Sequence, residues 1–206
     1  MRERGMLFVF DVGGVLVDLN PVARDSALHV ETCIAGAGIP HIKSYANASA
    51  VLLRDFRLGK IAEQTYVDRL AEELETSASQ IYLAEHSFIS KQNDHLIQII
   101  HQLRQTHRVV CLSNTQSIHW QHLTHYRLGN NLFDHTYLSH ELGLEKPDPE
   151  IFKVVTIREK YPVESIVLID DTIENVDAAK RFGWVESILH EDTDITSRQI
   201  ALLATA

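Results

Sequence analysis

Three apolar runs in this sequence each end in residues that can do chemistry. The runs lead into Asp11, into Ser113 and into the adjacent pair Asp170 and Asp171. Aspartate and serine also cap helices, but three endings of this kind favour a shared site over capping alone. In an open parallel sheet, ligands bind outside the carboxyl ends of the strands. We therefore expect these side chains to meet at one site.

Asp11 has the properties of a nucleophile for phosphoryl transfer. Its carboxylate can form an aspartyl-phosphate, and the turn after it contains Gly13 and Gly14, which let backbone N–H groups approach an oxyanion closely. Because a phosphate dianion would repel Asp11, a cation is needed nearby. Asp170 and Asp171 offer the hard carboxylate oxygens that Mg²⁺ prefers. The sequence therefore indicates a magnesium site beside the nucleophile.

Other residues can complete such a site. Ser113 can donate a hydrogen bond to a phosphoryl oxygen, and Lys146 can supply a fixed positive charge. His119, His122 and His125 follow Ser113 at helical spacing. A zinc site is not favoured, because no cysteine or acidic residue lies nearby at ligand spacing. His119 is the nearest of the three to Ser113, and we consider it a candidate for proton transfer.

The elements that must position these residues alternate between strand and helix. Nearly continuous apolar runs, which a parallel sheet covered on both faces requires, lie at 7–10, 108–112, 166–169 and 185–189, with a weaker one at 135–138. Between them, apolar residues recur at helical spacing. Asn93 or Asp94 is the expected N-cap of one helix, and Gly183 is the expected end of another. The pattern predicts an α/β fold with a doubly wound parallel sheet.

The interval between Asp11 and the run before Ser113 is too long for one crossover. It spans about a hundred residues, whereas a βαβ unit needs only about 30. The excess has helical spacing on both sides of a break at 58–60. We interpret residues 19–90 as an inserted helical cap on a core that comprises 1–18 and 91–206.

The composition fits an acidic globular protein. The 206 residues are 45% hydrophobic, which is enough for a packed core, and the net charge is −9. An acidic chain without a basic patch is not expected to bind nucleic acid or an anionic membrane. The early apolar run at 7–10 is too short for a secretory signal or a membrane span. Two cysteines, Cys33 and Cys111, make no disulfide framework, which favours the cytoplasm.

Four segments resemble the motifs of one enzyme family. They are 11–18 (DVGGVLVD), 112–115 (LSNT), 143–152 (GLEKPDPEIF) and 169–172 (IDDT). In this order and in these strand and loop contexts, they are similar to the four motifs of the haloacid dehalogenase-like hydrolase superfamily. Within it, the chain most resembles small sugar-phosphate phosphatases of the glucose-1-phosphatase type. Those also carry a glycine two residues after the nucleophile and a double aspartate in the last motif.

This resemblance implies a Rossmann-like core of strand order 3-2-1-4-5, with the cap inserted after the first motif. It implies Mg²⁺-dependent hydrolysis of a small phosphorylated molecule, with Asp11 as the nucleophile and Lys146 as a second catalytic residue. The residues implied to bind phosphate are Ser113, Asn114, Lys146, Gly13 and Gly14. Those implied to bind Mg²⁺ are Asp11, the Gly13 carbonyl, Asp170 and Asp171.

Gly13 departs from the pattern of most phosphatases of this superfamily. They carry a second aspartate there, which protonates the leaving alcohol and later deprotonates water. The carbonyl of Gly13 can bind Mg²⁺ but transfers no proton. General acid–base catalysis contributes about 10²–10⁴-fold. A sugar-1-phosphate needs less of this help, because its anomeric oxygen is a more acidic leaving group. His119 is a candidate replacement for the missing acid.

Two other functions stay open from the sequence. A haloacid dehalogenase also lacks the second aspartate, but these enzymes use no metal and typically carry Ser-Asn in place of Asp170 and Asp171. A binding protein with weakened catalysis is the other alternative, and the retained Asp11, Ser113 and Lys146 argue against complete loss of activity. The chain is expected to be a monomer or a homodimer.

Overall fold

The structure is a computed structural model that describes residues 5–28, 44–184 and 186–205. Cys33 and Val185 lie outside these ranges. The central sheet contains five parallel strands, which are β1 (Leu7–Phe10), β4 (Arg108–Ser113), β5 (His135–Leu138), β6 (Ile166–Asp170) and β7 (Ile188–Leu189). Their order is β5-β4-β1-β6-β7, which becomes 3-2-1-4-5 when only these strands are counted along the chain. The predicted α/β class with a parallel sheet is confirmed.

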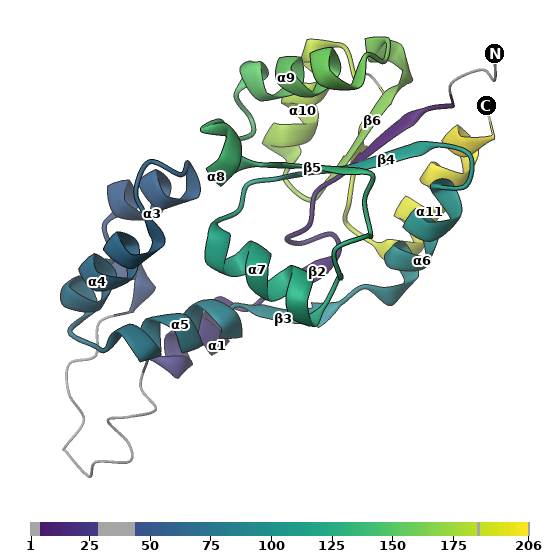
Figure 1. The fold of residues 1–206 in the computed structure, drawn as a ribbon. Helices are drawn as coiled ribbons and strands as arrows, with labels where there is room; N and C mark the ends of the chain where they lie inside the picture. The colour runs from purple at the N-terminus through teal and green to yellow at the C-terminus, as the bar shows by residue number, and fades with distance from the viewer. Residues whose placement is uncertain (1–4, 29–43, 185, 206) are drawn as a thin grey trace.

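Successive residues of each strand point to opposite faces of this sheet, and both faces are buried. Phe8 and Phe10 pack with α6 (Asp94–Leu103) and α11 (Thr193–Ala204) on one face. Leu7 and Val9 pack with α9 (Pro149–Glu159) and α10 (Ile173–Phe182) on the other. Figure 1 shows the two helix pairs on opposite sides of the strands. The continuous apolar runs are explained by burial on two faces.

The predicted helix ends are confirmed at two positions. The side chain of Asn93 accepts a hydrogen bond from the backbone N–H of Leu96 and caps α6. Gly183 ends α10 with a φ of 118°, a conformation that favours glycine. The predicted strand at 185–189 is shorter than expected, since only Ile188–Leu189 pair with β6. The tail forms α11, and Ile200 packs it against the sheet.

A helical segment lies between the first two strands of the central sheet. Its elements are α1 (Pro21–Ala27), the 3₁₀ turn η1 (Tyr45–Asn47), α3 (Ala50–Arg57), α4 (Glu63–Leu74) and α5 (Ala78–Ser87). Apolar residues from these helices form a hydrophobic cluster separate from those of the sheet, and Phe56, Tyr66 and Leu70 are among its buried members. Ile118 of α7 (Ser117–Tyr126) also joins this cluster, so the segment packs on a core helix. The exact boundaries of a cap domain at 19–90 stay a prediction.

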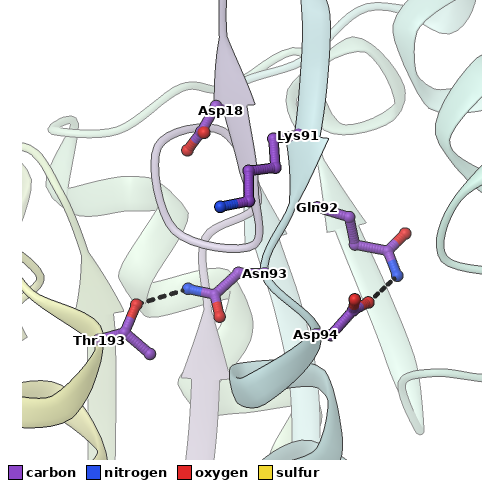
Figure 2. A pocket seen from close by; sticks show the side chains of 6 residues that line it. All are labelled: Asp18, Lys91, Gln92, Asn93, Asp94 and Thr193. Atoms are coloured by element: carbon purple, nitrogen blue, oxygen red, sulfur yellow. Dashed lines mark hydrogen bonds between the residues drawn. The ribbon is translucent and has the colours of Figure 1, made fainter.

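A short antiparallel ribbon joins this helical segment to the core. It consists of β2 (Val17–Leu19) and β3 (Ile89–Gln92), and the sequence analysis does not predict it. At its base, the amide of Asn93 donates hydrogen bonds to the Thr193 hydroxyl at 2.8 Å and to the Val15 carbonyl at 3.3 Å. A pocket of about 310 Å³ lies beside this anchor, and Figure 2 shows the side chains that line it. The ribbon therefore holds both connections of the helical segment at one place.

The helical segment also contacts the core at α8 (Ser139–Leu142). The Ser139 hydroxyl donates a hydrogen bond to the Arg57 carbonyl at 2.8 Å. Arg54 and Arg57 each form an ion pair with Glu145 at 2.8 Å. The turn after α3 approaches α8 so closely that a Cβ on Gly59 would overlap the carbonyl oxygen of His140. This close approach fixes one end of the helical segment on the core.

The Gly59 contact gives a stability prediction with an internal control. Gly59 and Gly129 have nearly the same φ, 65° and 67°, but a Cβ on Gly129 meets nothing within 4 Å. Gly129→Ala is expected to cost about 1 kcal/mol of unfolding free energy through left-handed strain alone. Gly59→Ala is expected to cost about 2–4 kcal/mol, because overpacking adds about 1–3 kcal/mol to that strain. Urea unfolding of the two variants measures the difference. Equal losses of unfolding free energy would show that the contact between Gly59 and His140 can relax without destabilising the protein.

Candidate active site

Three carboxylates meet at the carboxyl edge of the central sheet. Asp11 follows β1, Asp170 is the last residue of β6, and Asp171 comes directly after it. Their ligand oxygens all lie within 4.8 Å of one another. Side chains that commonly bind metals are those of Asp, Glu, His and Cys. Among the residues that the structure describes, this is the one group of three such side chains whose ligand atoms lie close enough together to hold a metal ion. The predicted convergence of these side chains is therefore found.

Lys146 lies at the centre of this cluster. Its ammonium group donates to Asp170 at 2.6 Å and to the Leu112 carbonyl at 2.7 Å, and it lies 3.1 Å from Asp11. The side chain is 0% exposed. The Asn114 side chain accepts from the Lys146 N–H and donates to the Lys146 carbonyl, both at 2.8 Å. Asn114, predicted to bind phosphate, thus holds the backbone of Lys146 in place.

The charges of this cluster do not balance. Burial raises the pKa of Asp11 to about 6, because lost hydration outweighs the attraction of Lys146. Burial and the charge of Asp170 raise the pKa of Asp171. Burial lowers the pKa of Lys146, but the two nearby carboxylates more than offset this and raise it above its usual range. Three carboxylates against one ammonium group leave an excess of negative charge, which a divalent cation with a preference for oxygen ligands would match.

The two aspartates after β6 differ in their hydrogen bonds. Asp170 is 0% exposed, and its second oxygen accepts from the Thr172 N–H at 3.0 Å and from the Asn175 amide at 2.9 Å. Asp171 is exposed and accepts a hydrogen bond from the Thr172 hydroxyl at 3.3 Å. Asp170 is therefore rigidly held, while Asp171 retains more lone pairs for a ligand.

The glycines after Asp11 have different roles in the turn. Gly14 has a φ of 75°, its N–H donates to the Val17 carbonyl at 2.8 Å, and a Cβ there would overlap the Asp171 carboxylate. In this structure Gly14 allows the left-handed conformation of the turn, and its lack of a side chain leaves space for the Asp171 carboxylate. Gly13 is not in the left-handed region, and the atoms nearest to a Cβ on it would belong to the Leu19 side chain, at 3.1 Å and beyond. The backbone at residue 13 does not itself require glycine.

Two small cavities lie between the sheet edge and the helical segment. One of about 60 Å³ is lined by Gly13, Ser113 and His119 of the core and by Phe88, which follows α5. The other, of about 190 Å³, shares His119 and Phe88 and extends to Arg24, Arg57, Tyr66 and Glu85. His119 lines both cavities, and Ser113, which is predicted to bind phosphate, lines the smaller one. The role of His119 stays a prediction.

Sequence reasoning missed three residues of this site. Asn175 holds Asp170, and Glu85 and Tyr66 of the helical segment reach the cavity beside His119. For Glu85 a signal existed: it occupies the apolar face of α5 that Ile81 and Ala84 define, where an ionised side chain needs a partner. The type and spacing of Asn175 and Tyr66 give no comparable signal.

Comparison with known proteins adds family information to this geometry. The sequence model described as haloacid dehalogenase-like hydrolase matches residues 6–183. A D-ribitol-5-phosphate phosphatase from Bacteroides thetaiotaomicron is 27% identical over 187 residues, which are 85% of this chain and 87% of that protein. A drimenol cyclase from Aspergillus calidoustus is 36% identical over 69 residues, which are 34% of this chain but only 13% of the cyclase.

A solved structure supports the same relationship. It is a HAD family enzyme from Bacteroides thetaiotaomicron in complex with magnesium and inorganic phosphate. Its chain is 25% identical to this one, with a TM-score of 0.79 over 93% of this chain and 98% of that chain. Among the described helices of the present chain, none combines the length and the hydropathy that crossing a membrane requires.

Proposed function

Because the chain belongs to the haloacid dehalogenase-like hydrolase family, we propose that it is a Mg²⁺-dependent phosphatase of a small sugar or sugar-alcohol phosphate. The observation that carries the proposal is the cluster of Asp11, Asp170 and Asp171 around the buried ammonium group of Lys146. Oxygen ligands of this kind fit Mg²⁺, which typically binds one or two carboxylates together with phosphate and water.

The residues that would hold Mg²⁺ are Asp11, Asp170, Asp171 and the carbonyl of Gly13. When bound, the ion would neutralise phosphate oxygens and stabilise charge that develops in the transition state. Asp171 offers the most accessible oxygens of the cluster, and Asp170 is oriented by Asn175 and Lys146.

Asp11 is proposed to attack the phosphorus atom and form an aspartyl-phosphate. Its side chain is 11% exposed, and its Oδ1 accepts a hydrogen bond from the N–H of Val12 at 2.7 Å, which fixes the carboxylate. Oδ2 lies 3.1 Å from the ammonium group of Lys146. As the bond between Asp11 and phosphorus forms, this ammonium group can stabilise the charge on a phosphoryl oxygen instead of the charge on the carboxylate. Ser113 is buried at the end of β4, and we propose that its hydroxyl donates a hydrogen bond to the phosphate.

The cavity dimensions favour a small substrate. Volumes of about 190 and about 60 Å³ lie below the ~300–1,000 Å³ of pockets for drug-sized ligands. The guanidinium of Arg24 lies over the rings of Tyr45 and Phe88, and its Nε has no hydrogen-bond partner among the described residues. Together with Glu85 and His119, this makes a polar wall that suits hydroxyl groups. A sugar-1-phosphate stays a candidate, and the similarity to a D-ribitol-5-phosphate phosphatase adds a sugar-alcohol phosphate.

The two alternatives are less well supported. A metal-independent dehalogenase would not need the adjacent carboxylates Asp170 and Asp171. A protein with weakened catalysis would not need Lys146 buried between two carboxylates, because that arrangement costs desolvation energy. The buried free thiol of Cys111 fits a reducing compartment such as the cytoplasm. That location, and the monomer or homodimer, stay predictions.

Metal removal tests the proposed function. With glucose 1-phosphate, glucose 6-phosphate, ribitol 5-phosphate and p-nitrophenyl phosphate as substrates, EDTA is expected to reduce phosphate release by on the order of 100-fold or more, because a bound metal contributes several kcal/mol. Mg²⁺ should restore the rate, and Ca²⁺ should restore less of it, because it prefers more ligands at longer distances. Undiminished hydrolysis in EDTA would contradict the metal site. Chloride release from 2-chloropropionate without metal would favour the dehalogenase.

A further inference from the structure

The space in front of Gly13 is bordered by a histidine. Gly13, Ser113 and His119 all line the cavity of about 60 Å³. A side chain on residue 13 would point toward Leu19, which lines the same cavity. Residue 13 carries no acid, and α7 brings an ionisable side chain to the cavity that residue 13 lines.

The ring of His119 is held at one nitrogen only. Its Nε2 lies 2.6 Å from a carboxylate oxygen of Glu85 and 3.3 Å from the side-chain amide of Gln116. Its face stacks on Phe88, with the ring centroids 5.4 Å apart. Within the described parts of the chain, Nδ1 has no hydrogen-bond partner. One nitrogen is thus fixed by a carboxylate, and the other is left without a hydrogen bond in the described parts of the chain, an arrangement that proton-transferring histidines also use.

Glu85 is an ionisable residue inside the helical segment. It is 1% exposed on α5, and its other oxygen accepts a hydrogen bond from the Tyr66 hydroxyl. Burial raises its pKa, but the charge of His119 and the hydrogen bonds from His119, Tyr66 and Gln116 lower it below its usual range. A buried carboxylate is costly unless it is paired. Its ionic partner is a residue of the core, so the pair forms only when the two parts of the protein are packed together.

We propose that His119 is the proton-transferring residue of this site and that Glu85 is the positioning residue that orients it. The proposal rests on the phosphatase function proposed above. It concerns the step for which Gly13 provides no acid.

The proton balance is complete for both halves of the reaction. When an oxygen of Asp11 bonds to phosphorus, the P–O bond to the alcohol breaks and its electron pair stays on the leaving oxygen, which takes a proton from protonated His119. In the second half, neutral His119 takes a proton from the water that attacks phosphorus. The bond to Asp11 then breaks, its carboxylate is restored, and phosphate leaves. His119 ends the cycle protonated, beside an ionised Glu85.

A leaving-group comparison tests His119. An alkyl phosphate needs a proton on its leaving oxygen, whereas p-nitrophenolate leaves without one. In His119→Gln, kcat/KM for ribitol 5-phosphate or glucose 6-phosphate is expected to fall by about 10²–10⁴-fold. kcat/KM for p-nitrophenyl phosphate should stay within about threefold, since it reports only the first half of the reaction. His125→Gln, an exposed position on the same helix, is the matched control and should change neither value.

Rapid mixing gives a second readout. Because the variant forms the intermediate from p-nitrophenyl phosphate but hydrolyses it slowly, His119→Gln should show a burst of p-nitrophenolate close to one equivalent per enzyme. Equal losses of kcat/KM on alkyl and aryl substrates, or no loss on the alkyl substrate, would overturn the role of His119. These outcomes differ from failure of the proposed function, in which the wild type releases no phosphate from any of the substrates.

Glu85 is tested by the same comparison. Glu85→Gln should lower kcat/KM for the alkyl substrate selectively, in the direction of His119→Gln but to a smaller extent. If this variant does not fold, Tyr66→Phe removes only the hydroxyl that donates to Glu85 and keeps the ring that stacks on Phe56. A positioning role predicts a selective loss there too. Losses that are the same for alkyl and aryl substrates would show that Glu85 is merely structural.

Discussion

Replacement of Asp11 by asparagine is expected to reduce phosphate release by on the order of 10⁴-fold or more, with the fold retained. The amide has nearly the shape of the carboxylate but is not a nucleophile, so no covalent intermediate can form. The fold should tolerate it, because burial already disfavours the charge of Asp11, whose pKa is raised to about 6. Urea unfolding is expected to show equal or greater stability, and steady-state kinetics should show the loss.

Two controls accompany this variant. Asp18→Asn changes an exposed carboxylate of the same segment and should leave turnover unchanged. Beryllofluoride, which mimics a phosphoryl group, should bind the Asp11 carboxylate of the wild type and not Asp11→Asn, as followed by fluorine NMR. Near-normal turnover in Asp11→Asn would place the nucleophile elsewhere.

Lys146→Met is expected to destabilise the protein by about 3–5 kcal/mol, which is the usual cost of leaving buried charges without their partner. The ammonium group is completely buried and contacts Asp11, Asp170 and the Leu112 carbonyl. Without it, two buried carboxylates face each other, and the carbonyl loses its donor. Urea unfolding in EDTA measures this cost.

A surface lysine provides the comparison. Lys153→Met removes an exposed ion pair with Glu150 and should cost less than about 1 kcal/mol. Mg²⁺ is expected to restore part of the stability of Lys146→Met, because a cation that binds only the folded state stabilises it by mass action. A cost of less than 1 kcal/mol for Lys146→Met in EDTA would contradict the view that this lysine compensates the carboxylates.

The sequence predicts the sheet and the acidic cluster because both depend on local rules. Apolar runs without alternation indicate strands that are buried on both faces, and the strand directions place Asp11, Ser113 and Asp170 at one edge. The structure shows this placement for all three. Their roles in catalysis stay predictions, because geometry alone does not measure turnover.

Features that depend on packing between distant segments were not predicted. β2 and β3 pair residues 17–19 with residues 89–92, and the segment Ser-Lys-Gln in β3 has no apolar alternation that would reveal a strand. The contact between Glu85 and His119 joins residues 34 positions apart and exists only because α5 packs on α7. The sequence shows each residue but not the distance between them.

The β2–β3 ribbon bears on how this protein can evolve. The helical segment leaves the core and returns to it at one anchored place, the β2–β3 ribbon. The distance between these two connections therefore does not depend on how many residues lie between them. Doubling the length of a flexible loop costs only about 0.6 kcal/mol. Insertions and deletions in the helical segment can therefore reshape the cavity wall without disturbing the pairing of β1 with β4 and β6. Under the proposed function, we expect substrate preference to diverge while Asp11 and Lys146 stay fixed. A change at Glu85 in the helical segment would then require a matching change at His119 in the core.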